Sequence, residues 1–418
     1  MEEQDRLKPM TETAILAAVD TGEYDADSSL DELEELARTA GAEVIGRLVQ
    51  KRESPNTATC IGAGRLEELA GLAANTACDL VIFDRELTAT QQRNLEDALP
   101  CRVVDRTLLI LDIFAGRARS SEGRLQVELA QLQYLLPRLA GQGTALSRLG
   151  GGIGTRGPGE TKLESDRRHI RRRIKNLKLQ LAEVQRQRET RRARRQKIGL
   201  PTVALVGYTN AGKSTLLNAL TDAGVLAENM LFATLDPTAR ALKLPDGRQV
   251  MLIDTVGLVR RLPHLLVEAF RSTLEEAANA DLILNVCDIS APDAAEQIAV
   301  STGLLREIGA QTVPVLNVLN KCDRLSALPE TIGRENCLIS ARTGMGLDLL
   351  LERIAATLAP THTRMKVLIP YDQGAVAGEI RSRGTVYAEE FLPEGVLLDA
   401  MIDRSILAQC GKFLYQGK

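Results

Sequence analysis

One glycine-rich segment carries the residue types of a phosphate-binding loop. It matches the pattern G-x-x-x-x-G-K-[ST] and consists of Gly207, Tyr208, Thr209, Asn210, Ala211, Gly212, Lys213 and Ser214, followed by Thr215. An apolar strand, 203–206, precedes it, and a helical pattern, 215–220, follows. Glycines here let backbone N–H groups converge on phosphate oxygens at a helix N-terminus. We therefore expect Lys213 to bridge the β- and γ-phosphates of a nucleotide and Ser214 to ligate Mg²⁺.

A second motif selects the base. The residues Asn320, Lys321, Cys322 and Asp323 follow the apolar strand 313–319, about 110 residues after the phosphate loop. The carboxylate of Asp323 can accept hydrogen bonds from N1–H and the 2-amino group of guanine. Adenine offers neither donor and would leave the carboxylate unpaired, at a cost of ~1–3 kcal/mol. The pattern predicts guanine, with Ser340, Ala341 and Arg342 in the loop under the base.

Two further segments fit the moving parts of such a site. The first is a D-x-x-G motif after the strand 250–253, made of Asp254, Thr255, Val256 and Gly257. We expect Asp254 to hold Mg²⁺ through water and the Gly257 amide to sense the γ-phosphate. The second segment is Phe232, Ala233 and Thr234. Thr234 is expected to ligate Mg²⁺ in the GTP state, with Thr238 as second choice. Both segments would be released with phosphate, and Lys213, Thr234 and Gly257 are the predicted catalytic residues.

The residue after Gly257 bears on the mechanism. Ras-type enzymes carry there a Gln that orients the attacking water, but this chain has Leu258, which can neither donate nor accept a hydrogen bond. Intrinsic hydrolysis should therefore be slow, with a partner or another residue supplying the missing group. Asn210, the fourth residue of the loop, could help to bind K⁺, and this is a hypothesis. The alternative is that Asn210 only stabilises the loop.

Around these motifs, apolar periodicity predicts an α/β protein of four parts. Residues 1–110 alternate between strands and helices, as in a small α/β unit. Residues 111–197 hold two apolar heptad seams, through Leu125 and Leu129 and through Ile170 and Ile174, joined by a glycine-rich loop at about 141–161. They predict an antiparallel helical hairpin. Residues 198–360 form the nucleotide domain, with a mixed doubly wound sheet, and 361–418 a small α/β appendage.

The charge is unevenly distributed. The chain of 418 residues has a net charge of −3, but residues 162–197 hold fifteen Lys/Arg and four Asp/Glu. Such density beside a glycine-rich loop predicts contact with RNA phosphates, although most charged helix faces are merely solvated. Aromatic residues make up 3% and Trp is absent, so base-stacking platforms are not expected.

The compartment is predicted from what the sequence lacks. The seven cysteines have no C-x-x-C pair, which favours reduced thiols over a disulfide framework or zinc site. We find neither a signal peptide at the start nor an apolar run of the ~18 residues that a membrane span needs. A cytoplasmic protein is expected, and the heptad seams, joined by a loop, favour a monomer.

The motifs and their flanks resemble the HflX family of ribosome-associated GTPases, within the Obg-HflX superfamily. The resemblance rests on the glycine-rich stretch 151–164 (GGIGTRGPGETKLE), on 232–236 (FATLD) and on the segments 262–264 (LPH) and 266–271 (LVEAFR). It covers roughly residues 14–360. One departure is Leu258, where the family is expected to have Phe; the change keeps the hydrophobic character.

The resemblance implies a translation-factor-type G domain behind a two-part N-terminal domain. It implies binding to the large ribosomal subunit, with the hairpin and its glycine-rich tip reaching ribosomal RNA. It also implies dissociation of stalled or idle ribosomes in the GTP state, particularly under stress.

Alternatives remain at the level of sequence. The chain could be a GTP-controlled assembly factor of the large subunit, or an RNA-remodelling, helicase-like ATPase that acts through the N-terminal domain. Gly62-Ala63-Gly64-Arg65 could mark a second nucleotide site, but a helix-capping turn is the favoured interpretation. Arg260 and Arg261 could reach the γ-phosphate or contact RNA, and His264 is expected to have a structural or relay role.

Overall fold

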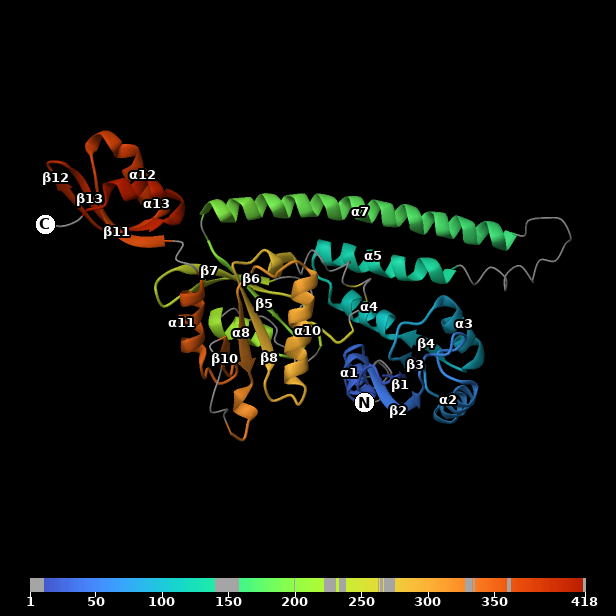
Figure 1. Cartoon of the computed structure of the whole chain (residues 1–418). Coiled ribbons are helices and arrows are strands. Elements are labelled where there is room, and N and C mark those ends of the chain that lie inside the picture. The colour runs from blue at the N-terminus through green and yellow to red at the C-terminus, as the bar shows by residue number, and fades with distance from the viewer. Residues whose placement is uncertain are drawn as a thin grey trace, which may run out of the picture.

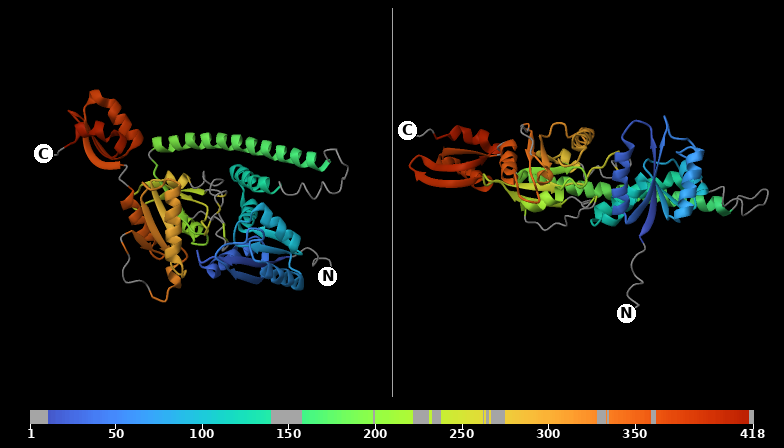
Figure 2. Two further views of the ribbon diagram at one scale, coloured as in Figure 1. Left: turned by 45° about the vertical axis from the view of Figure 1, so that its right-hand side comes forward. Right: turned by 90° about the horizontal axis from the view of Figure 1, so that it is seen from below.

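The computed structural model describes residues 11–139, 158–198, 200–221, 231–232, 238–261, 263, 266, 275–327, 333, 335–358 and 362–415. Figure 1 shows two α/β bodies side by side, a long helix that runs along both, and a smaller body at the C-terminal end. The other two views show the same arrangement (Figure 2). Among the described helices, none is both long enough and apolar enough to cross a membrane.

The N-terminal domain is a parallel sheet covered by helices. Its elements are β1 (Glu12–Asp20), α1 (Ala26–Thr39), β2 (Ala42–Lys51), α2 (Ala63–Thr76), β3 (Leu80–Phe83), α3 (Ala89–Ala98), β4 (Arg102–Asp105) and α4 (Arg106–Arg117). The strand order is β2-β1-β3-β4, and every pairing is parallel. The strands β1 and β3 are almost entirely buried because helices cover both faces, as their unbroken apolar runs predict.

Two of its helices begin at the turns that the sequence indicates. Thr88 caps α3 through a capping box with Gln91. Gly62 is the N-cap of α2, and its N–H donates to Gln50 Oε1 at 2.8 Å. Gly62 to Arg65 therefore form the start of a helix, as favoured above.

The hairpin consists of α5 (Ser121–Arg138) and the 41-residue α7 (Pro158–Ile198). The second predicted seam is confirmed, because Ile170, Ile174, Leu177, Leu181 and Val184 are less exposed than the residues between them. The first seam matches only in part: Leu129 is buried, but the other buried large side chains of α5 are Gln126, Val127 and Tyr134. Two ion pairs join the helices. Arg173 contacts Glu128 at 2.6 Å, and Arg188 contacts Glu122 at 2.8 Å.

The predicted loop between these helices is shorter than expected. Residues 158–161 belong to the first turn of α7, because Pro158 can open a helix, where its missing N–H costs nothing. The preceding part of that loop lies outside the described residues.

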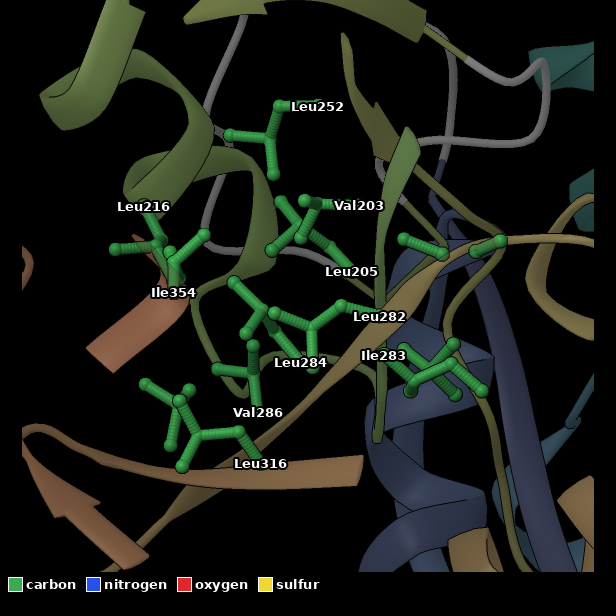
Figure 3. Close-up of a cluster of buried hydrophobic side chains, with 14 of the residues drawn as sticks. Val203, Leu205, Leu216, Leu252, Leu282, Ile283, Leu284, Val286, Leu316 and Ile354 are labelled. Carbon is green, nitrogen blue, oxygen red and sulfur yellow. The ribbon is translucent and has the colours of Figure 1, made fainter. Parts of the chain in front are cut away.

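The nucleotide domain is built on a six-stranded mixed sheet. Its elements are β5 (Thr202–Gly207), α8 (Lys213–Thr221), β6 (Thr238–Lys243), β7 (Gln249–Asp254), β8 (Leu282–Asp288), α10 (Ala294–Glu307), β9 (Val315–Asn320), β10 (Asn336–Leu338) and α11 (Leu347–Thr357). The order is β10-β9-β8-β5-β7-β6, with only β6 antiparallel to its neighbour. Buried side chains from β5, β7, β8 and β9 pack with those of α8 and α11 (Figure 3).

The C-terminal body is an antiparallel three-stranded sheet with helices on one face. It comprises β11 (His362–Ile369), α12 (Gly374–Arg383), β12 (Thr385–Leu392), β13 (Gly395–Asp403) and α13 (Arg404–Cys410), in the order β11-β13-β12. It has a hydrophobic core of its own, which includes Val367, Ile380 and Leu398. The predicted small α/β appendage therefore has its expected strands and helix.

Candidate nucleotide-binding site

The phosphate-loop motif lies between β5 and α8, at the carboxyl edge of the sheet. Gly207 and Gly212 have φ angles of +147° and +92°, which side chains rarely tolerate. A Cβ at Gly207 would lie 2.0 Å from the backbone oxygen of Val286. Asn210 also has a positive φ, of +60°, and its side chain is exposed. The two glycines therefore allow a tight loop that opens into the N-terminus of α8.

Lys213 lies inside this loop. It is 6% exposed, and its Nζ donates to the backbone oxygens of Gly207 at 2.9 Å and of Tyr208 at 2.7 Å. Burial lowers the pKa of Lys213 to about 8, while the Asp254 carboxylate acts in the opposite direction. These two hydrogen bonds to backbone carbonyls fix the ammonium group within the loop.

Two side chains whose oxygen atoms can bind a metal ion lie close to this lysine. Ser214 Oγ donates to Asp254 Oδ2 at 2.8 Å, which joins the start of α8 to the end of β7. Asp254 is fully buried. Hydroxyl and carboxylate oxygens are the hard ligands that Mg²⁺ prefers, and Mg²⁺ is usually completed by water and phosphate oxygens. The two predicted metal ligands that the structure describes therefore fit this ion.

The residues after Asp254 pack tightly against the phosphate loop. A Cβ at Gly257 would lie 2.6 Å from Thr209 Cγ2 and 3.3 Å from Lys213 Nζ, so this position accepts only glycine without rearrangement. Leu258 N donates to Gly207 O at 3.1 Å, and Thr209 N donates to Leu258 O at 2.7 Å. The Leu258 side chain is 2% exposed and lies in the core of the domain. It cannot orient a water molecule, as the sequence predicts.

The base-side motif is held together by Asn320. Its Nδ2 donates to Ala211 O at 2.8 Å, and its Oδ1 accepts from Ala341 N at 2.9 Å. One buried amide thus ties the phosphate loop to the loop after β10. The sequence placed Asn320 in the motif but gave no sign of this double contact, which joins residues more than one hundred positions apart.

Asp323 lies at the edge of the same loop. Its Oδ1 accepts from Ser340 Oγ at 2.7 Å, and its Oδ2 lies 3.4 Å from the exposed Arg342. The Ser340 hydroxyl, with a smaller effect from Arg342, lowers the pKa of this carboxyl. Lys321 has a φ of +63° and pairs with Asp288 at 2.7 Å. A carboxylate acceptor is therefore in the position required by the base-recognition hypothesis.

Other predicted residues are distributed differently. Thr255 is buried and its Oγ1 donates to Leu205 O at 2.6 Å, so it supports the sheet. Thr215 lies in the first turn of α8. Thr238 begins β6 opposite Asp254. Ala233, Thr234 and His264 lie outside the described residues.

Phe232 and Val256 need a correction. Both side chains are buried in a hydrophobic cluster shared with the N-terminal domain, and the Phe232 ring meets the Phe114 ring edge-on at 4.5 Å. Their side chains are therefore parts of an interdomain contact rather than of a nucleotide pocket. The motif indicated their place in the chain but not the neighbour from another domain.

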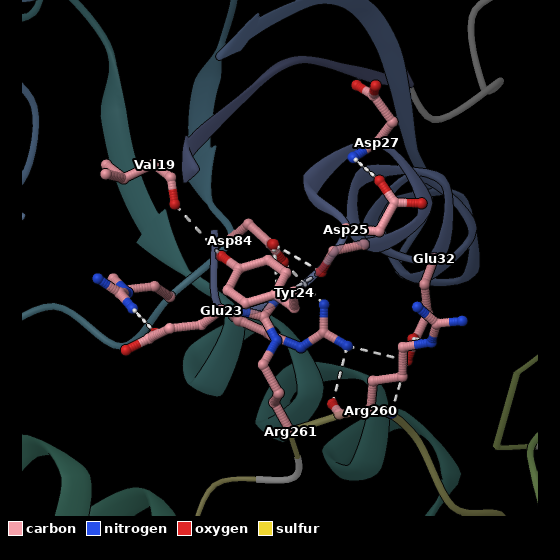
Figure 4. A network of polar contacts seen from close by, with 12 residues as sticks. Val19, Glu23, Tyr24, Asp25, Asp27, Glu32, Asp84, Arg260 and Arg261 are labelled. Atoms are coloured by element: carbon pink, nitrogen blue, oxygen red, sulfur yellow. Dashed lines mark hydrogen bonds and ion pairs between the residues drawn. The ribbon is translucent and has the colours of Figure 1, made fainter. Parts of the chain in front are cut away.

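A network of charged groups joins the segment after Gly257 to the N-terminal domain (Figure 4). Arg261 pairs with Asp84 at 2.6 Å, donates to Ser29 Oγ and lies 3.8 Å above the Tyr24 ring. Arg106 pairs with Asp84 at 2.8 Å and with Glu32 at 2.9 Å. We call these contacts, together with those of Arg260 below, the interdomain clamp.

Arg260 completes the clamp from the same segment. Its backbone N donates to Glu32 Oε1 at 3.1 Å, and its backbone O accepts from Arg106 Nη2 at 3.0 Å. Its guanidinium pairs with Asp293 and with Glu296. Burial raises the pKa of Glu32, with Arg106 as the strongest opposing influence.

The sequence left open whether Arg260 and Arg261 reach the γ-phosphate or contact RNA. In the structure the Arg260 side chain is buried, whereas Arg261 is exposed and paired with Asp84. Arg260 is 8% exposed, and carboxylates of the chain itself neutralise both guanidinium groups. One feature of the sequence could have indicated buried charge pairing here. Asp84 directly follows the buried strand β3, and Arg106 directly follows the neighbouring strand β4.

A cavity of about 310 Å³ separates the phosphate loop from α1 of the N-terminal domain. Tyr208, Thr209 and Asn210 line it on one side, and Glu32 and Glu35 on the other. The phosphate loop, the segment after Gly257 and the N-terminal domain thus meet around one space.

The fold and this set of motifs define a P-loop GTP-binding protein. Three family profiles match consecutive parts of the chain: "GTP-binding GTPase N-terminal" at residues 27–115, "GTP-binding GTPase Middle Region" at 117–195 and "50S ribosome-binding GTPase" at 202–321. The chain is 54% identical to the GTPase HflX of Caldanaerobacter subterraneus subsp. tengcongensis, over 99% of this chain and 96% of that protein. It is 44% identical to the GTPase HflX of Escherichia coli, over 85% and 84%.

The chain belongs to the HflX family of GTPases, and it is a GTP-hydrolysing enzyme. Among solved structures, it is similar to a GTP-binding protein from Sulfolobus solfataricus in complex with GDP. That match has 26% identity and a TM-score of 0.44 and covers 83% of this chain and 98% of that one.

Proposed function

We propose that this GTPase binds the large ribosomal subunit and, in its GTP state, separates the subunits of stalled or idle ribosomes. The observation that carries the proposal is the interdomain clamp. It attaches the residues directly after Gly257 to the domain from which the basic hairpin extends. A change at the γ-phosphate can therefore act on the position of the hairpin through direct contacts.

The nucleotide half of the proposal assigns roles to the described residues. Lys213 would exchange its two carbonyl acceptors for β- and γ-phosphate oxygens, which are stronger acceptors because they are charged. Ser214 and Asp254 would hold Mg²⁺, which neutralises charge between the β- and γ-phosphates. The Gly257 N–H would bind the γ-phosphate, and Asp323 would accept from guanine. Thr234, between Phe232 and Thr238, would complete the Mg²⁺ site.

The ribosomal half rests on α7. Arg168, Arg171, Arg172, Lys175 and Lys178 are exposed on it. Arg173 and Arg188 have a different role, because they hold α5 against α7 through Glu128 and Glu122. The exposed set supports contact with RNA phosphates, which gives an affinity that falls with salt and selects little sequence. The profile described as "50S ribosome-binding GTPase" supports the large subunit as the partner.

The test is steady-state GTP hydrolysis with and without purified large subunits at a matched K⁺ concentration. Strong stimulation is expected, because Leu258 leaves the site without a group to orient water. Light scattering of intact ribosomes should then fall with GTP and the chain present. Stimulation by incomplete particles alone would favour large-subunit assembly instead, and no stimulation would disprove the ribosome link.

Two variants test the nucleotide half and the ribosomal half of the proposal separately. Thr234→Ala should abolish splitting while leaving GDP binding largely intact; wild-type splitting would make Thr238 the better candidate. Replacing Arg171 and Arg172 with Ala should weaken subunit binding and reduce its salt dependence while leaving GDP affinity unchanged.

We also propose that Asn210 helps K⁺ to stimulate hydrolysis, since its exposed side chain lines the cavity beside the phosphate loop. Equal rates in K⁺ and Na⁺ buffers would disprove this role.

A further inference from the structure

Two cysteines of the N-terminal domain face one another. Cys78 precedes β3 and Cys101 precedes β4, and their sulfur atoms are 3.7 Å apart. Cys78 is 6% exposed, and Cys101 is half-buried. Neither belongs to the nucleotide site or to the interdomain clamp, so no part of the proposed function uses them.

The backbone around the pair is compatible with a covalent link. The strands β3 and β4 are parallel neighbours, with Leu80 opposite Arg102, and Arg102 N donates to Asp79 O at 3.2 Å. Neighbouring strands lie about 4.8 Å apart. A disulfide joins Cα atoms at about 4.4–6.8 Å and sulfur atoms at about 2.05 Å. By this register Cys101 lies opposite Asp79, so Cys78 is offset from it by one residue, and the sulfur separation of 3.7 Å shows that the two side chains already converge.

The pair is also accessible to small molecules. Both thiols line a surface depression of about 610 Å³, together with Asp79, Glu96 and Arg102. Other cysteines have different neighbours. Cys287 donates to the backbone oxygen of Ala294, and Cys322 faces the thioether of Met345, which cannot form a disulfide.

We propose that Cys78 and Cys101 form a redox-active dithiol, which hydrogen peroxide converts into an intrachain disulfide. The sulfur of Cys101, the more exposed thiol, attacks a peroxide oxygen. The O–O bond breaks, a sulfenic acid forms and one water leaves. The sulfur of Cys78 then attacks the sulfur of Cys101, the S–O bond breaks, and hydroxide leaves with the thiol proton as a second water. Two electrons pass from the two thiols to the peroxide.

The reaction is a slow one. Burial, followed by the hydrogen bond with Cys78 and the charge of Asp79, raises the pKa of Cys101 to about 12. Because the thiolate is the reactive form, brief exposure to peroxide leaves the pair reduced, and sustained exposure closes it.

The disulfide acts as a staple on the domain. It closes a loop between residues 23 positions apart, which contains β3 and α3, and so restricts the unfolded chain. The pair lies at the amino ends of β3 and β4, whereas Asp84 and Arg106 of the clamp directly follow their carboxyl ends. Oxidation therefore stabilises the domain without changing the clamp or the nucleotide site.

The experiment uses the full-length chain with GDP and hydrogen peroxide under native conditions, followed by non-reducing peptide mapping. A peptide linked through Cys78 and Cys101 is expected, with a higher Tm that dithiothreitol reverses and an unchanged rate of GTP hydrolysis. Cys78→Ser and Cys101→Ser should each abolish both the link and the Tm shift. Cys337→Ser, which removes another buried thiol, should retain both.

Two results would overturn the proposal. One is sulfinic acid at Cys101 with no linked peptide. The other is linked peptides that include other cysteines at similar yield, as expected if unfolded chains were reacting. A linked peptide without a Tm shift would support the dithiol and refute its stabilising effect on the domain.

Discussion

The nucleotide site and the interdomain clamp lie on either side of one cavity, but they are built differently. In the nucleotide site, Lys213 and its carbonyl partners are at most six positions apart. In the clamp, Arg261 and Ser29 are 232 positions apart, and Arg106 and Arg260 are 154 apart. The lysine contacts depend on local backbone geometry, with Asn320 tying the phosphate loop to a more distant loop of the same domain, whereas the clamp depends on the docking of two domains.

This difference separates what each site controls. The local site decides which nucleotide binds, because glycine turns and a strand end fix donors and acceptors. The clamp decides what the segment after Gly257 is attached to. Substitutions in the clamp should therefore lower the free energy of unfolding and the coupling between the domains more than nucleotide affinity. Substitutions in the nucleotide site should do the reverse.

Asp84→Ala should have the largest effect on stability. Asp84 is fully buried and pairs with both Arg106 and Arg261, so its removal takes one of two carboxylates from the buried Arg106 guanidinium and leaves Glu32 to balance it. We expect the free energy of unfolding to fall by about 3–5 kcal/mol in denaturant titration. Glu68→Ala, which breaks the exposed pair with Arg65, should cost at most about 1 kcal/mol. Equal losses in the two variants would contradict a buried clamp.

Lys213→Ala should have the largest effect on nucleotide binding. Contacts to both the β- and the γ-phosphate would be lost, about 3 kcal/mol in all, or on the order of 100-fold in affinity for GTP. Calorimetric titration would measure it. Lys243→Ala, on the exposed face of β6, is the matched control and should bind as wild type does. Wild-type affinity in Lys213→Ala would refute the phosphate-loop assignment.

Asp323→Asn should change the preferred base from guanine to xanthine. Loss of the carboxylate should weaken GTP about 10- to 100-fold, while the Asn amide can donate to the extra oxygen of xanthine and so favour XTP. Competition binding with both nucleotides would measure the change. Asp246→Asn, on the turn after β6, should leave the preference for GTP unaltered. An unchanged preference in Asp323→Asn would refute the base pocket.

The affinity for nucleotide should also depend on pH through Lys213. Its pKa is about 8 in the free protein, so above this pH a proton must be taken up before the ammonium can bind phosphate. Affinity should fall by up to about tenfold per pH unit above 8. Stability of the free protein should change in the opposite sense. The unfolded state binds more protons between pH 8 and the ordinary lysine pKa, so stability rises with pH there. A flat affinity profile to pH 9.5 would show that the lysine stays charged.

Much of the fold could be predicted from periodicity. The apolar run Leu80–Phe83 is a strand with those bounds, and the seam through Ile170 and Leu177 packs against α5. The loop before α7 was predicted less well, because glycine and proline signal a turn, while Pro158 also opens a helix. Phe232 and Val256 lie in the segments that their motifs indicate, but the motifs gave no sign that their side chains pack in a cluster shared with the N-terminal domain. Their partners come from a domain more than one hundred residues away.

The sequence by itself determined the nucleotide chemistry, because backbone turns at Gly207 and Gly212 and a carboxylate after a strand act over a few residues. Only the tertiary structure decided where Arg260 and Arg261 lie. A charged side chain looks the same in sequence whether water, RNA or a buried carboxylate surrounds it. The docking of the N-terminal domain against the segment after Gly257 brought Glu32 of α1 and Asp84, which follows β3, to these arginines. Because Asp84 is buried, its carboxylate needs a positively charged partner.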